Sequence, residues 1–507
     1  MQISMFDGDK PFKVDKPLRL ITLFSGYDSQ ALALKYIGVP FEHYRTCEWA
    51  IPSIQALKDL HFENDDTDYS VGMSKAQLVE TLYKSGVSAD YNKPLTKEQL
   101  QRYGESKMRT IYNNIRACHN LVSICNAKGA DLGIKETNKY CYLLTYSFPC
   151  QDLSAAGLGK GMERGSGTRS GMLWEVERLL KETKELPQVL LMENVKQVIG
   201  QKNIKAFAEW VAFLDELGYH SKWQVINATD FSIPQNRERC FMVSVLGNHY
   251  YEFPKVIGNK LQLKDVLEKN VAERYYLSEK IVETYYKRNI LNAYKGNGFR
   301  FEPTEGENIA NSVLTRNGSR PCDNYIIQRS HGFNKGCKIV GLLGGKFEHT
   351  LDLTRRVYDV NAVAPTITTC GGGNTEPKIM EEKDESKQDK EIIVFDDYNN
   401  CVKADQSSVG TLTRNCGNDA IRNGVKIVEK ECDYRVRKLT ERECGRLMGV
   451  KDDDISKIGK NLSRSAQYHT FGDSIVTACL MAIFGKMFNV DYESKIKELT
   501  KKITGEG

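Results

Sequence analysis

The chain has 507 residues, of which 27% are charged and 40% hydrophobic, and this length predicts about two or three globular domains. Its formal net charge of +5 is too small for a histone-like polybasic protein, although it permits a local basic face for nucleic acid. The 14 cysteines include no C-x-x-C pair and the eight histidines form no H-x₃₋₅-H cluster, which argues against a zinc finger or ribbon. We therefore expect no metal site.

No segment of the sequence is typical of export or membrane insertion. Met1–Lys16 mixes Asp and Lys without an apolar core, and the longest apolar stretch, Ile475–Phe484, is too short to cross a bilayer. Cysteines in a chain without an export signal are expected to stay reduced and mostly buried. These features predict a cytoplasmic protein with no membrane partner.

In chain order, the first half alternates short apolar runs with segments of helical periodicity. The run Leu20–Phe24 precedes a predicted helix, Asp28–Tyr36, and a later helix is predicted over Asn203–Leu217. Further runs of strand length are Tyr142–Tyr146, Val189–Met192, Trp223–Ile226 and Phe241–Val245. Strands buried on both faces that alternate with helices predict an α/β fold with a doubly wound, mostly parallel sheet. Residues 63–128 are polar and helical in pattern, and we interpret them as an insertion.

After about Tyr250 the composition changes, because glycine and asparagine become denser and the predicted strands shorter. A weak repeat of β-rich tetrads, each running into a turn, occurs at 313–318, 366–371 and 411–417. Its uneven spacing argues against a solenoid and predicts hairpins in a smaller β-rich domain. We therefore predict a large domain of residues 1–250 plus 435–507, with a domain of residues 251–434 inserted into it.

Cys150 follows a predicted strand, directly after a proline in the segment Ser147–Gln151. Catalytic groups in open α/β sheets lie beyond the carboxyl ends of strands, and proline fixes the approach of the backbone. Two interpretations are open at this point. Cys150 is a nucleophile that needs help to ionise, or it is one more buried cysteine in a turn.

Three charged residues lie at the ends of other predicted strands. Glu193 is placed where a buried carboxyl group can act as a general acid, although a helix cap or a salt bridge would also place an acid there. Arg237 and Arg239 enter the Phe241 strand two positions apart, so both would point toward one anionic or carbonyl group, unless they form a solvated edge. Together with Cys150, these residues would converge on one crevice.

These motifs, with later ones, resemble the DNA (cytosine-5)-methyltransferase family of bacterial or phage type. Ser147–Ser154 is similar to the family's P-C-Q loop, Glu193–Val195 to its E-N-V motif and Gln235–Arg239 to its Q-x-R-x-R motif. Further similar segments are Arg437–Cys444 (R-x-L-T-x-R-E), Gly472–Val476 (G-N-S-V), Arg356–Tyr358 and Ala364–Gly372. The resemblance implies a Rossmann-like S-adenosylmethionine-dependent methyltransferase fold, with residues 251–434 as a target-recognition domain.

The resemblance also implies transfer of a methyl group from S-adenosylmethionine to carbon-5 of a cytosine flipped out of a specific duplex DNA sequence. Cys150 would add to carbon-6 of the base, and Glu193 would hold a proton at the ring nitrogen. Arg239, with Arg237, would bind the base carbonyl. A water or a loop group would remove the carbon-5 proton, and the glycine-rich segment after Cys150 would close over the base.

The methyl donor is expected at the first strand, where Phe24-Ser25-Gly26 resembles the family's F-x-G. Asp28 and Ser29 stand where glycines are usual, a departure that bears on the donor-binding geometry. Glu48 would bind the ribose hydroxyls, Trp49 would pack on adenine and Asp131 would read its amine. The expected donor-binding residues are Phe24, Ser25, Gly26, Glu48, Trp49, Asp131, Asp473 and Ser474.

Expected DNA contacts are basic and polar residues of the loops and repeats: Gln151, Ser154, Lys160, Arg164, Arg169, Gln235, Arg316, Thr368 and Arg414. The resemblance further implies a monomer of the bacterial cytosol, associated with the nucleoid, whose partners are duplex DNA and a cognate restriction endonuclease. Two alternatives stay open: a methyltransferase of RNA cytosine, and a catalytically impaired nucleic-acid-binding relative. The absence of G-x-G-x-x-G at Gly26 disfavours a nicotinamide oxidoreductase.

Overall fold

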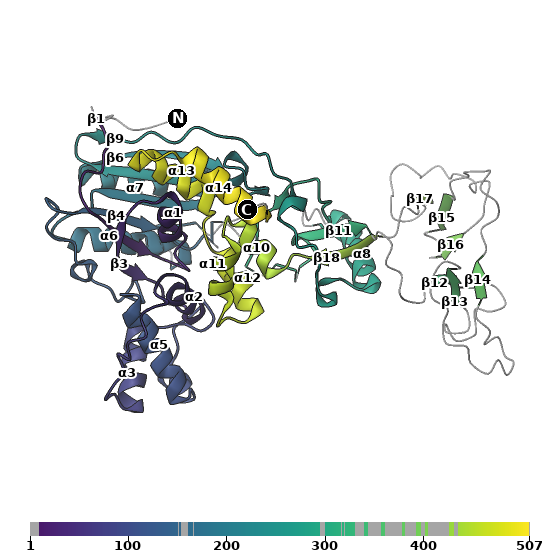
Figure 1. The fold of residues 1–507 in the computed structure, drawn as a ribbon, viewed down its shortest axis with the longest axis horizontal. Helices are drawn as coiled ribbons and strands as arrows, with labels where there is room; N and C mark the ends of the chain where they lie inside the picture. Colours follow the sequence, from purple (N-terminus) through teal and green to yellow (C-terminus); the bar gives the residue numbers. More distant parts are fainter. Residues whose placement is uncertain are drawn as a thin grey trace. The chain divides into compact units, whose positions relative to one another are not determined.

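The computed structural model describes residues 10–150, 152–153, 161–165, 167–294, 300–315, 317–318, 320–329 and 434–505, together with short strands between 339 and 429. The chain divides into two compact units, Met1–Ile327 with Val436–Gly507, and Gln328–Arg435 (Figure 1). The expected boundary at residue 250 differs from this division. Residues 251–327 pack with the first unit because Leu263, Val266 and Val313 belong to its hydrophobic core.

The first unit is built on a six-stranded sheet with strand order β3-β2-β4-β5-β8-β6. The strands are β2 (Leu18–Leu23), β3 (Phe41–Cys47), β4 (Cys141–Tyr146), β5 (Val189–Val195), β6 (Tyr219–Asn227) and β8 (Glu238–Leu246). Neighbouring strands from β3 to β5 are parallel, whereas β8 is antiparallel to both β5 and β6. The predicted mostly parallel α/β sheet is confirmed.

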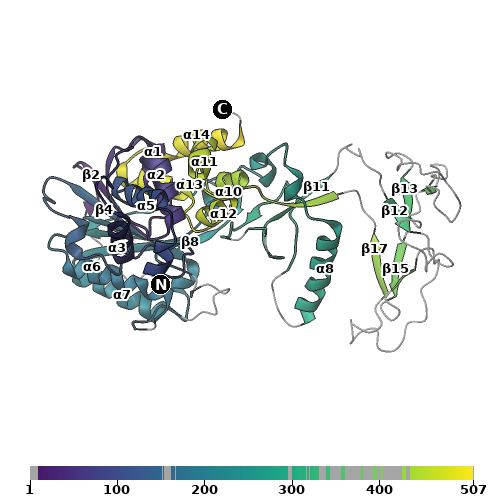
Figure 2. The same cartoon turned by 90° about the horizontal axis from the view of Figure 1, so that it is seen from below.

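Alternate side chains of the strands enter two cores on opposite faces of the sheet. Leu20 and Leu143 pack in the core that contains α1, α13 and α14, whereas Ile21 and Leu144 pack in the core of α6 and α7. These helices are α1 (Ser29–Ile37), α6 (Leu173–Glu182), α7 (Ile204–Glu216), α13 (Thr477–Phe488) and α14 (Tyr492–Thr504). Figure 2 shows the sheet between the two helical layers. The C-terminal helices therefore complete the cover of a sheet made by the first half of the chain.

Arg464–Phe488 is the one stretch of the described residues with the length and apolarity of a membrane span, and 78% of its most apolar window is buried. Ala478, Leu480 and Phe484 in this stretch are fully buried in the core against the sheet. This burial is that of a core helix.

Residues 63–128 form a helical projection beyond α2 (Ile51–His61), in which α3 and α5 lie side by side (Figure 1). Its helices are α3 (Lys75–Ser85), α4 (Lys97–Gln101) and α5 (Glu105–Ala117). Capping boxes at Ser74 and Thr96 begin α3 and α4. The helices share a core of their own, in which Leu78, Leu82 and Met108 are fully buried, so the projection is a packed substructure.

Short strand pairs and further helices lie outside the central sheet. Short pairs are β1 (Lys10–Pro11) with β9 (His249–Tyr250), β7 (Gln235–Asn236) with β10 (Ala310–Asn311), and β11 (Tyr325–Arg329) with β18 (Tyr434–Lys438). The remaining helices are α8 (Glu279–Tyr294), α10 (Glu441–Leu447), α11 (Asp452–Gly459) and α12 (Arg464–Gly472).

The described strands of the second unit form two three-stranded sheets. One has the order β12-β13-β14 and the other β16-β15-β17. Their bounds are β12 (Ile339–Leu342), β13 (Arg356–Asp359), β14 (Lys378–Met380), β15 (Ile392–Asp396), β16 (Cys401–Lys403) and β17 (Val425–Glu429). The unit is β-rich, as predicted for this region, and the repeats at 366–371 and 411–417 lie outside the described residues.

Candidate active site

Cys150 lies on the loop that leaves the carboxyl end of β4, and its side chain is partly exposed. The loop is fixed from two sides, because Asn194 Nδ2 donates to the Phe148 carbonyl (2.9 Å) and Ser170 Oγ donates to the Pro149 carbonyl (2.8 Å). Both supporting side chains are buried. Neither residue was assigned a role from the sequence, although Asn194 lies within the E-N-V segment next to Glu193.

Glu193 and Arg239 meet because β8 runs antiparallel to β5. In the register of this pair, Arg239 lies opposite Val195 and Phe241 lies opposite Glu193, so the two charged residues are diagonal neighbours on one face. Arg239 Nε lies 3.2 Å from Glu193 Oε1. Burial raises the pKa of Glu193, and the charge of Arg239 opposes that shift. The pair thus holds a carboxyl group that is easier to protonate than an exposed one.

The Cys150 thiol interacts electrostatically with both members of this pair. Burial raises the pKa of Cys150, the positive charge of Arg239 lowers it, and an ionised Glu193 raises it further. A protonated Glu193 beside Arg239 therefore favours the thiolate form of Cys150. Cys150, Glu193 and Arg239 thus lie within electrostatic range of one another, and their catalytic roles stay a prediction.

Arg237 corrects the expectation that two arginines would reach one group. Its Nη1 donates to the Val313 carbonyl (3.0 Å), and its Nη2 donates to the carbonyls of Gly472 (3.0 Å) and Ser474 (2.8 Å). Residues two positions apart point to the same side only within one continuous strand. Arg237 lies in the break between β7 and β8, so its side chain does not follow that of Arg239. Its donors hold the 313–315 segment and the C-terminal segment together.

Gln235 is a second correction, because it was expected to contact DNA. Its side chain is fully buried, its Nε2 donates to the Leu447 carbonyl (2.7 Å), and its Oε1 accepts the Val313 N–H (2.9 Å). Gly472 lies at the same junction, where an added Cβ would come within 2.4 Å of the Thr315 nitrogen. The Q-x-R part of the motif therefore joins three chain segments behind the site.

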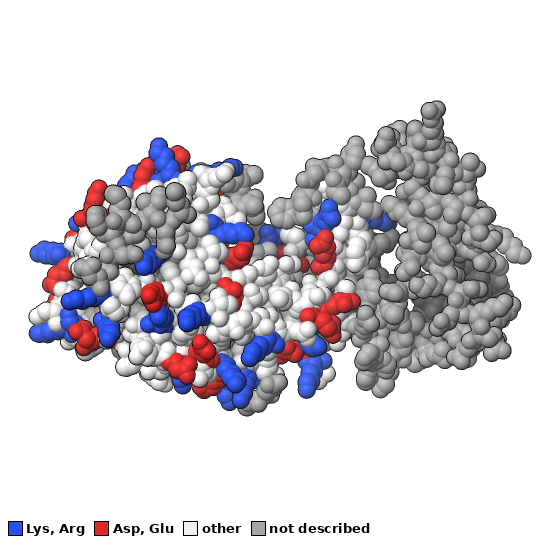
Figure 3. Space-filling view, turned by 90° about the horizontal axis from the view of Figure 1, so that it is seen from above, with Lys and Arg blue, Asp and Glu red and all other residues white. Residues whose placement is uncertain are grey.

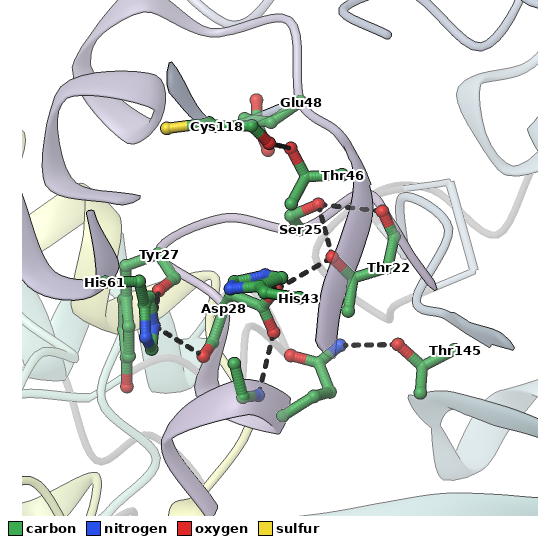
Figure 4. Close-up of polar contacts among 12 residues, drawn as sticks. Thr22, Ser25, Tyr27, Asp28, His43, Thr46, Glu48, His61, Cys118 and Thr145 are labelled. Atoms are coloured by element: carbon green, nitrogen blue, oxygen red, sulfur yellow. Dashed lines mark hydrogen bonds and ion pairs between the residues drawn. The ribbon is translucent and has the colours of Figure 1, made fainter. Parts of the chain in front are cut away.

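The turn after β2 carries the expected donor residues Phe24, Ser25 and Gly26. Ser25 Oγ donates to the Thr22 carbonyl (2.8 Å), as Figure 4 shows. It also accepts the Cys47 N–H (3.1 Å), and the Gly26 N–H donates to Glu48 Oε2 (2.9 Å). Phe24 and Gly26 have φ angles of 59° and 56°. A Cβ on Gly26 would meet nothing within 4 Å, so the space beside this turn is open.

Asp28 explains how the turn tolerates the loss of a glycine. It adopts the left-handed conformation (φ 61°, ψ 66°) and caps α1 by accepting the Ala31 N–H (3.0 Å). Its other oxygen accepts from Thr22 Oγ1 (2.8 Å) and lies 2.7 Å from His43 Nε2, in the buried cluster of Figure 4. Burial alone would raise the pKa of Asp28, but His43, His61 and the Ala31 N–H together outweigh it and the pKa is lowered. Because this carboxylate is satisfied inside the fold, the departure at Asp28 and Ser29 leaves the Ser25–Gly26 turn intact.

Glu48 and Asp473 are the two acids at this end of the site. Burial raises the pKa of Glu48 to about 7. Asp473 Oδ2 lies 3.1 Å from His469 Nδ1, and 47% of its side chain is exposed. Ser474 differs from its expected role, since its buried hydroxyl donates to the Phe471 carbonyl (2.8 Å) at the end of α12.

Asp131 was expected to bind the adenine of the donor, but its side chain is engaged in a different part of the structure. It is exposed in a 3₁₀ turn, Gly129–Leu132, where its carboxylate accepts the Lys128 N–H (2.8 Å). Asn120 meets Glu48 instead, because its Oδ1 accepts the Glu48 N–H (2.9 Å) and its Nδ2 donates to the Glu48 carbonyl (2.9 Å). The long insertion concealed this residue from sequence reasoning. Trp49 packs against the insertion core and stays partly exposed.

Besides the buried Gln235, two of the residues expected to contact DNA lie in the described part of the chain, namely Arg164 and Arg169. Arg164 pairs with Glu177 (2.6 Å), and Arg169 Nε lies 3.8 Å from Asp152, with about half of each arginine exposed (50% and 48%). Gln151, Ser154, Lys160, Arg316, Thr368 and Arg414 lie outside the described residues. On the face shown in Figure 3, the described basic and acidic side chains are interspersed.

The comparisons with known proteins define the class. A model of the family described as C-5 cytosine-specific DNA methylase matches residues 101–489, which is more than half of the chain. The chain therefore belongs to this family, and it is a DNA (cytosine-5-)-methyltransferase. The resemblance inferred from its motifs is confirmed.

Two of the similar curated proteins are bacterial. The chain is 37% identical over 266 residues to the orphan methyltransferase M.SssI of Spiroplasma monobiae, which covers 52% of this chain and 68% of the relative. It is 32% identical over 290 residues to the type II methyltransferase M2.ScrFI of Lactococcus lactis subsp. cremoris (55% and 77%). The methyltransferase EhMeth of Entamoeba histolytica has the same fold, with a TM-score of 0.50 at 12% identity over 94% of this chain and 99% of that one.

Proposed function

We propose that the chain methylates carbon-5 of a cytosine flipped out of a specific duplex DNA sequence, through a covalent intermediate on Cys150 and with S-adenosylmethionine as the donor. The observation that carries this proposal is the convergence of the Cys150 loop on the Glu193–Arg239 pair, with its 3.2 Å contact. Base flipping is required because carbon-6 cannot be reached inside a stacked duplex.

In the proposed reaction, the Cys150 thiolate forms a bond to carbon-6 of the base while Glu193 gives a proton to the ring nitrogen. Carbon-5 then carries enamine electron density and takes the methyl group. Arg239 binds the base carbonyl and stabilises the charge that develops there. A water or a loop group removes the carbon-5 proton, the bond to sulfur breaks, the thiolate leaves, and the ring-nitrogen proton returns to Glu193. Arg237 and Asn194 are positioning residues in this scheme.

The residues at the Gly26 turn fit S-adenosylmethionine. The open space beside Gly26 permits close approach of a ligand, and the carboxylates of Glu48 and Asp473 suit ribose hydroxyls and cationic groups. Phe24, Ser25, Asn120 and the exposed part of Trp49 would complete the binding surface. The donor supplies an electrophilic methyl group on a sulfonium; the chain binds and orients it.

The wider assignment follows the family. We assign residues 251–434 to target recognition, although residues 251–327 pack with the first unit. The remaining proposals are a cytoplasmic monomer whose partners are duplex DNA and a cognate restriction endonuclease, with Arg164 and Arg169 contacting phosphates.

The test of this function is methyl transfer from labelled S-adenosylmethionine to duplex DNA and to RNA, followed by deamination sequencing. Label on carbon-5 of cytosine within one DNA sequence context is the expected result. Label on RNA alone would favour an RNA methyltransferase. Transfer to neither nucleic acid, with a folded protein, would favour a non-catalytic relative.

Glu193→Gln should lower kcat by about 10²- to 10³-fold, because the amide keeps a polar group facing Arg239 but cannot give a proton to the base. The measurement is single-turnover methylation at saturating donor and DNA. Glu238→Gln is the matched control, since Glu238 is an exposed partner of Lys196 and should leave kcat unchanged. Equal rates for Glu193→Gln and the wild type would remove the acid from the scheme.

Donor binding should tighten by roughly five- to tenfold between about pH 6 and pH 7.5, if Glu48 binds ribose as a carboxylate. The sign follows from its raised pKa of about 7, since the free protein holds Glu48 mostly protonated at the lower pH and mostly ionised at the upper one. Calorimetric titration with S-adenosylmethionine measures the trend. Glu48→Gln should bind more weakly and flatten the slope; an unchanged slope in that variant would assign the titration to another group.

A further inference from the structure

The loop 88–94 of the helical insertion is fixed directly beside the predicted donor residues. Ser88 N–H donates to the Trp49 carbonyl (2.8 Å), and Ile51 N–H donates to the Ser88 carbonyl (2.8 Å). The loop therefore continues the backbone pairing at the segment that begins with Glu48. No family motif named above includes this loop, so its position follows from the structure alone.

Tyr91 occupies the tip of this loop in an uncommon backbone conformation. Its φ angle is 62°, in the left-handed region that non-glycine residues rarely adopt. Asp90 Oδ1 fixes the turn by accepting the N–H groups of Asn92 (3.0 Å) and Lys93 (3.3 Å). Strained conformations of this kind cluster at ligand-binding positions, where the surrounding structure holds them.

The Tyr91 ring stacks on His469 of α12, with ring centroids 3.6 Å apart and an interplanar angle of 13°. His469 Nδ1 in turn lies 3.1 Å from the Asp473 carboxylate, so the stack is joined to one of the two donor-site acids. Ser53 Oγ approaches the Tyr91 hydroxyl at 3.5 Å from the side of α2. The insertion and the C-terminal segment thus meet in one aromatic contact at the donor end of the site.

Both acids act on the Tyr91 phenol. Burial, together with the charges of Glu48 and Asp473, raises the pKa of Tyr91 to about 12, and hydrogen bonding to Ser53 and Thr470 opposes that rise. The phenol therefore lies within electrostatic range of both acids. A tyrosine within electrostatic range of two carboxylates, of which Asp473 is 47% exposed, is suited to a ligand that carries positive charge.

We propose that Tyr91 and its stack on His469 form a wall of the S-adenosylmethionine pocket, so that the helical insertion completes the donor site. This inference rests on the proposed function in one respect, namely that S-adenosylmethionine is the donor. It assigns the insertion a role in donor binding, with Tyr91 as a binding residue that positions the cationic end of the donor.

The test is calorimetric titration of the full chain with S-adenosylmethionine. Tyr91→Ala should raise Kd by at least about tenfold, whereas Tyr91→Phe, which keeps the ring, should stay within about twofold. Tyr83→Ala is the matched control, because Tyr83 is an exposed tyrosine of the same insertion (44%), and it should leave Kd unchanged. DNA affinity and Tm report a purely structural role, and in Tyr91→Phe and Tyr91→Ala both should match the wild type.

Unchanged donor affinity in Tyr91→Ala would overturn the proposal. So would a loss of donor affinity that is matched by equal losses of DNA affinity and Tm, since that pattern describes a destabilised fold. A raised KM for the donor with unchanged kcat at saturation would agree with it. Failure of the proposed function is distinguishable, because it would appear as a wild type that binds no S-adenosylmethionine.

Discussion

Cys150→Ser should reduce methyl transfer by at least about 10⁴-fold, because a hydroxyl beside Arg239 does not provide the nucleophile that a thiolate does. Cys150 is partly exposed, so the substitution removes chemistry without opening a cavity. The loop itself is held by Asn194 and Ser170 through backbone carbonyls, and neither contact involves the sulfur. DNA affinity should therefore stay within about twofold of the wild type by filter binding or fluorescence anisotropy.

The matched control for this experiment is Cys125→Ser. Cys125 is an exposed free cysteine, and its replacement should leave both the rate and DNA binding unchanged. Substantial methylation by Cys150→Ser would remove Cys150 from the nucleophilic role. A parallel loss in Cys125→Ser would instead point to general thiol sensitivity.

Glu443→Ala should destabilise the protein by about 3–5 kcal/mol, because it removes the carboxylate that pairs with the buried charge of Arg437. The two side chains form a bidentate pair with both N–O distances at 2.8 Å, and only 2% and 0% of their surfaces are exposed. Glu443 also accepts the Thr440 N–H (2.8 Å) in the capping box that begins α10. Urea denaturation followed by circular dichroism measures the loss.

Two further variants separate the pair from its surroundings. Glu498→Ala removes an exposed acid from α14 and should change stability by less than about 0.5 kcal/mol. Replacing both Arg437 and Glu443 by apolar residues of similar volume should recover much of the loss, since no charge is then left buried. A loss below about 1 kcal/mol for Glu443→Ala would mean that water or another group compensates Arg437.

The sheet and the core of the site could be predicted from the sequence. The inner strands β2, β4, β5 and β8 have continuous apolar runs because both of their faces are covered, and such runs are visible without a structure, whereas the edge strand β3 has none. Cys150 follows β4 and Glu193 lies near the end of β5, and these two strands are neighbours and parallel. Because parallel strands end at the same edge of a sheet, the sequence is enough to predict that the two residues lie near each other. Arg239 reaches the same edge because β8 enters the sheet in the opposite direction.

Other parts of the site depend on contacts that no local pattern encodes. Gln235 and Arg237 are polar residues next to a charged strand end, yet they are buried because segments from distant parts of the chain close over them. Asn120 lies within the predicted insertion, so it was not considered as a donor-site residue, and the acidic Asp131 was chosen instead. The Tyr91–His469 contact joins residues that are almost four hundred positions apart, so only the fold could place them together.

The most direct test of the proposed chemistry is to trap the covalent intermediate. A duplex in which 5-fluorocytosine replaces cytosine cannot lose a proton from carbon-5, so an adduct formed at carbon-6 should persist in the presence of S-adenosylmethionine. Mass spectrometry of the digested complex should locate the base on the peptide that contains Cys150, and Cys150→Ser should form no adduct. An adduct on another cysteine, or active methylation of ordinary DNA without any adduct on the fluorinated duplex, would contradict the assignment of Cys150 as the nucleophile.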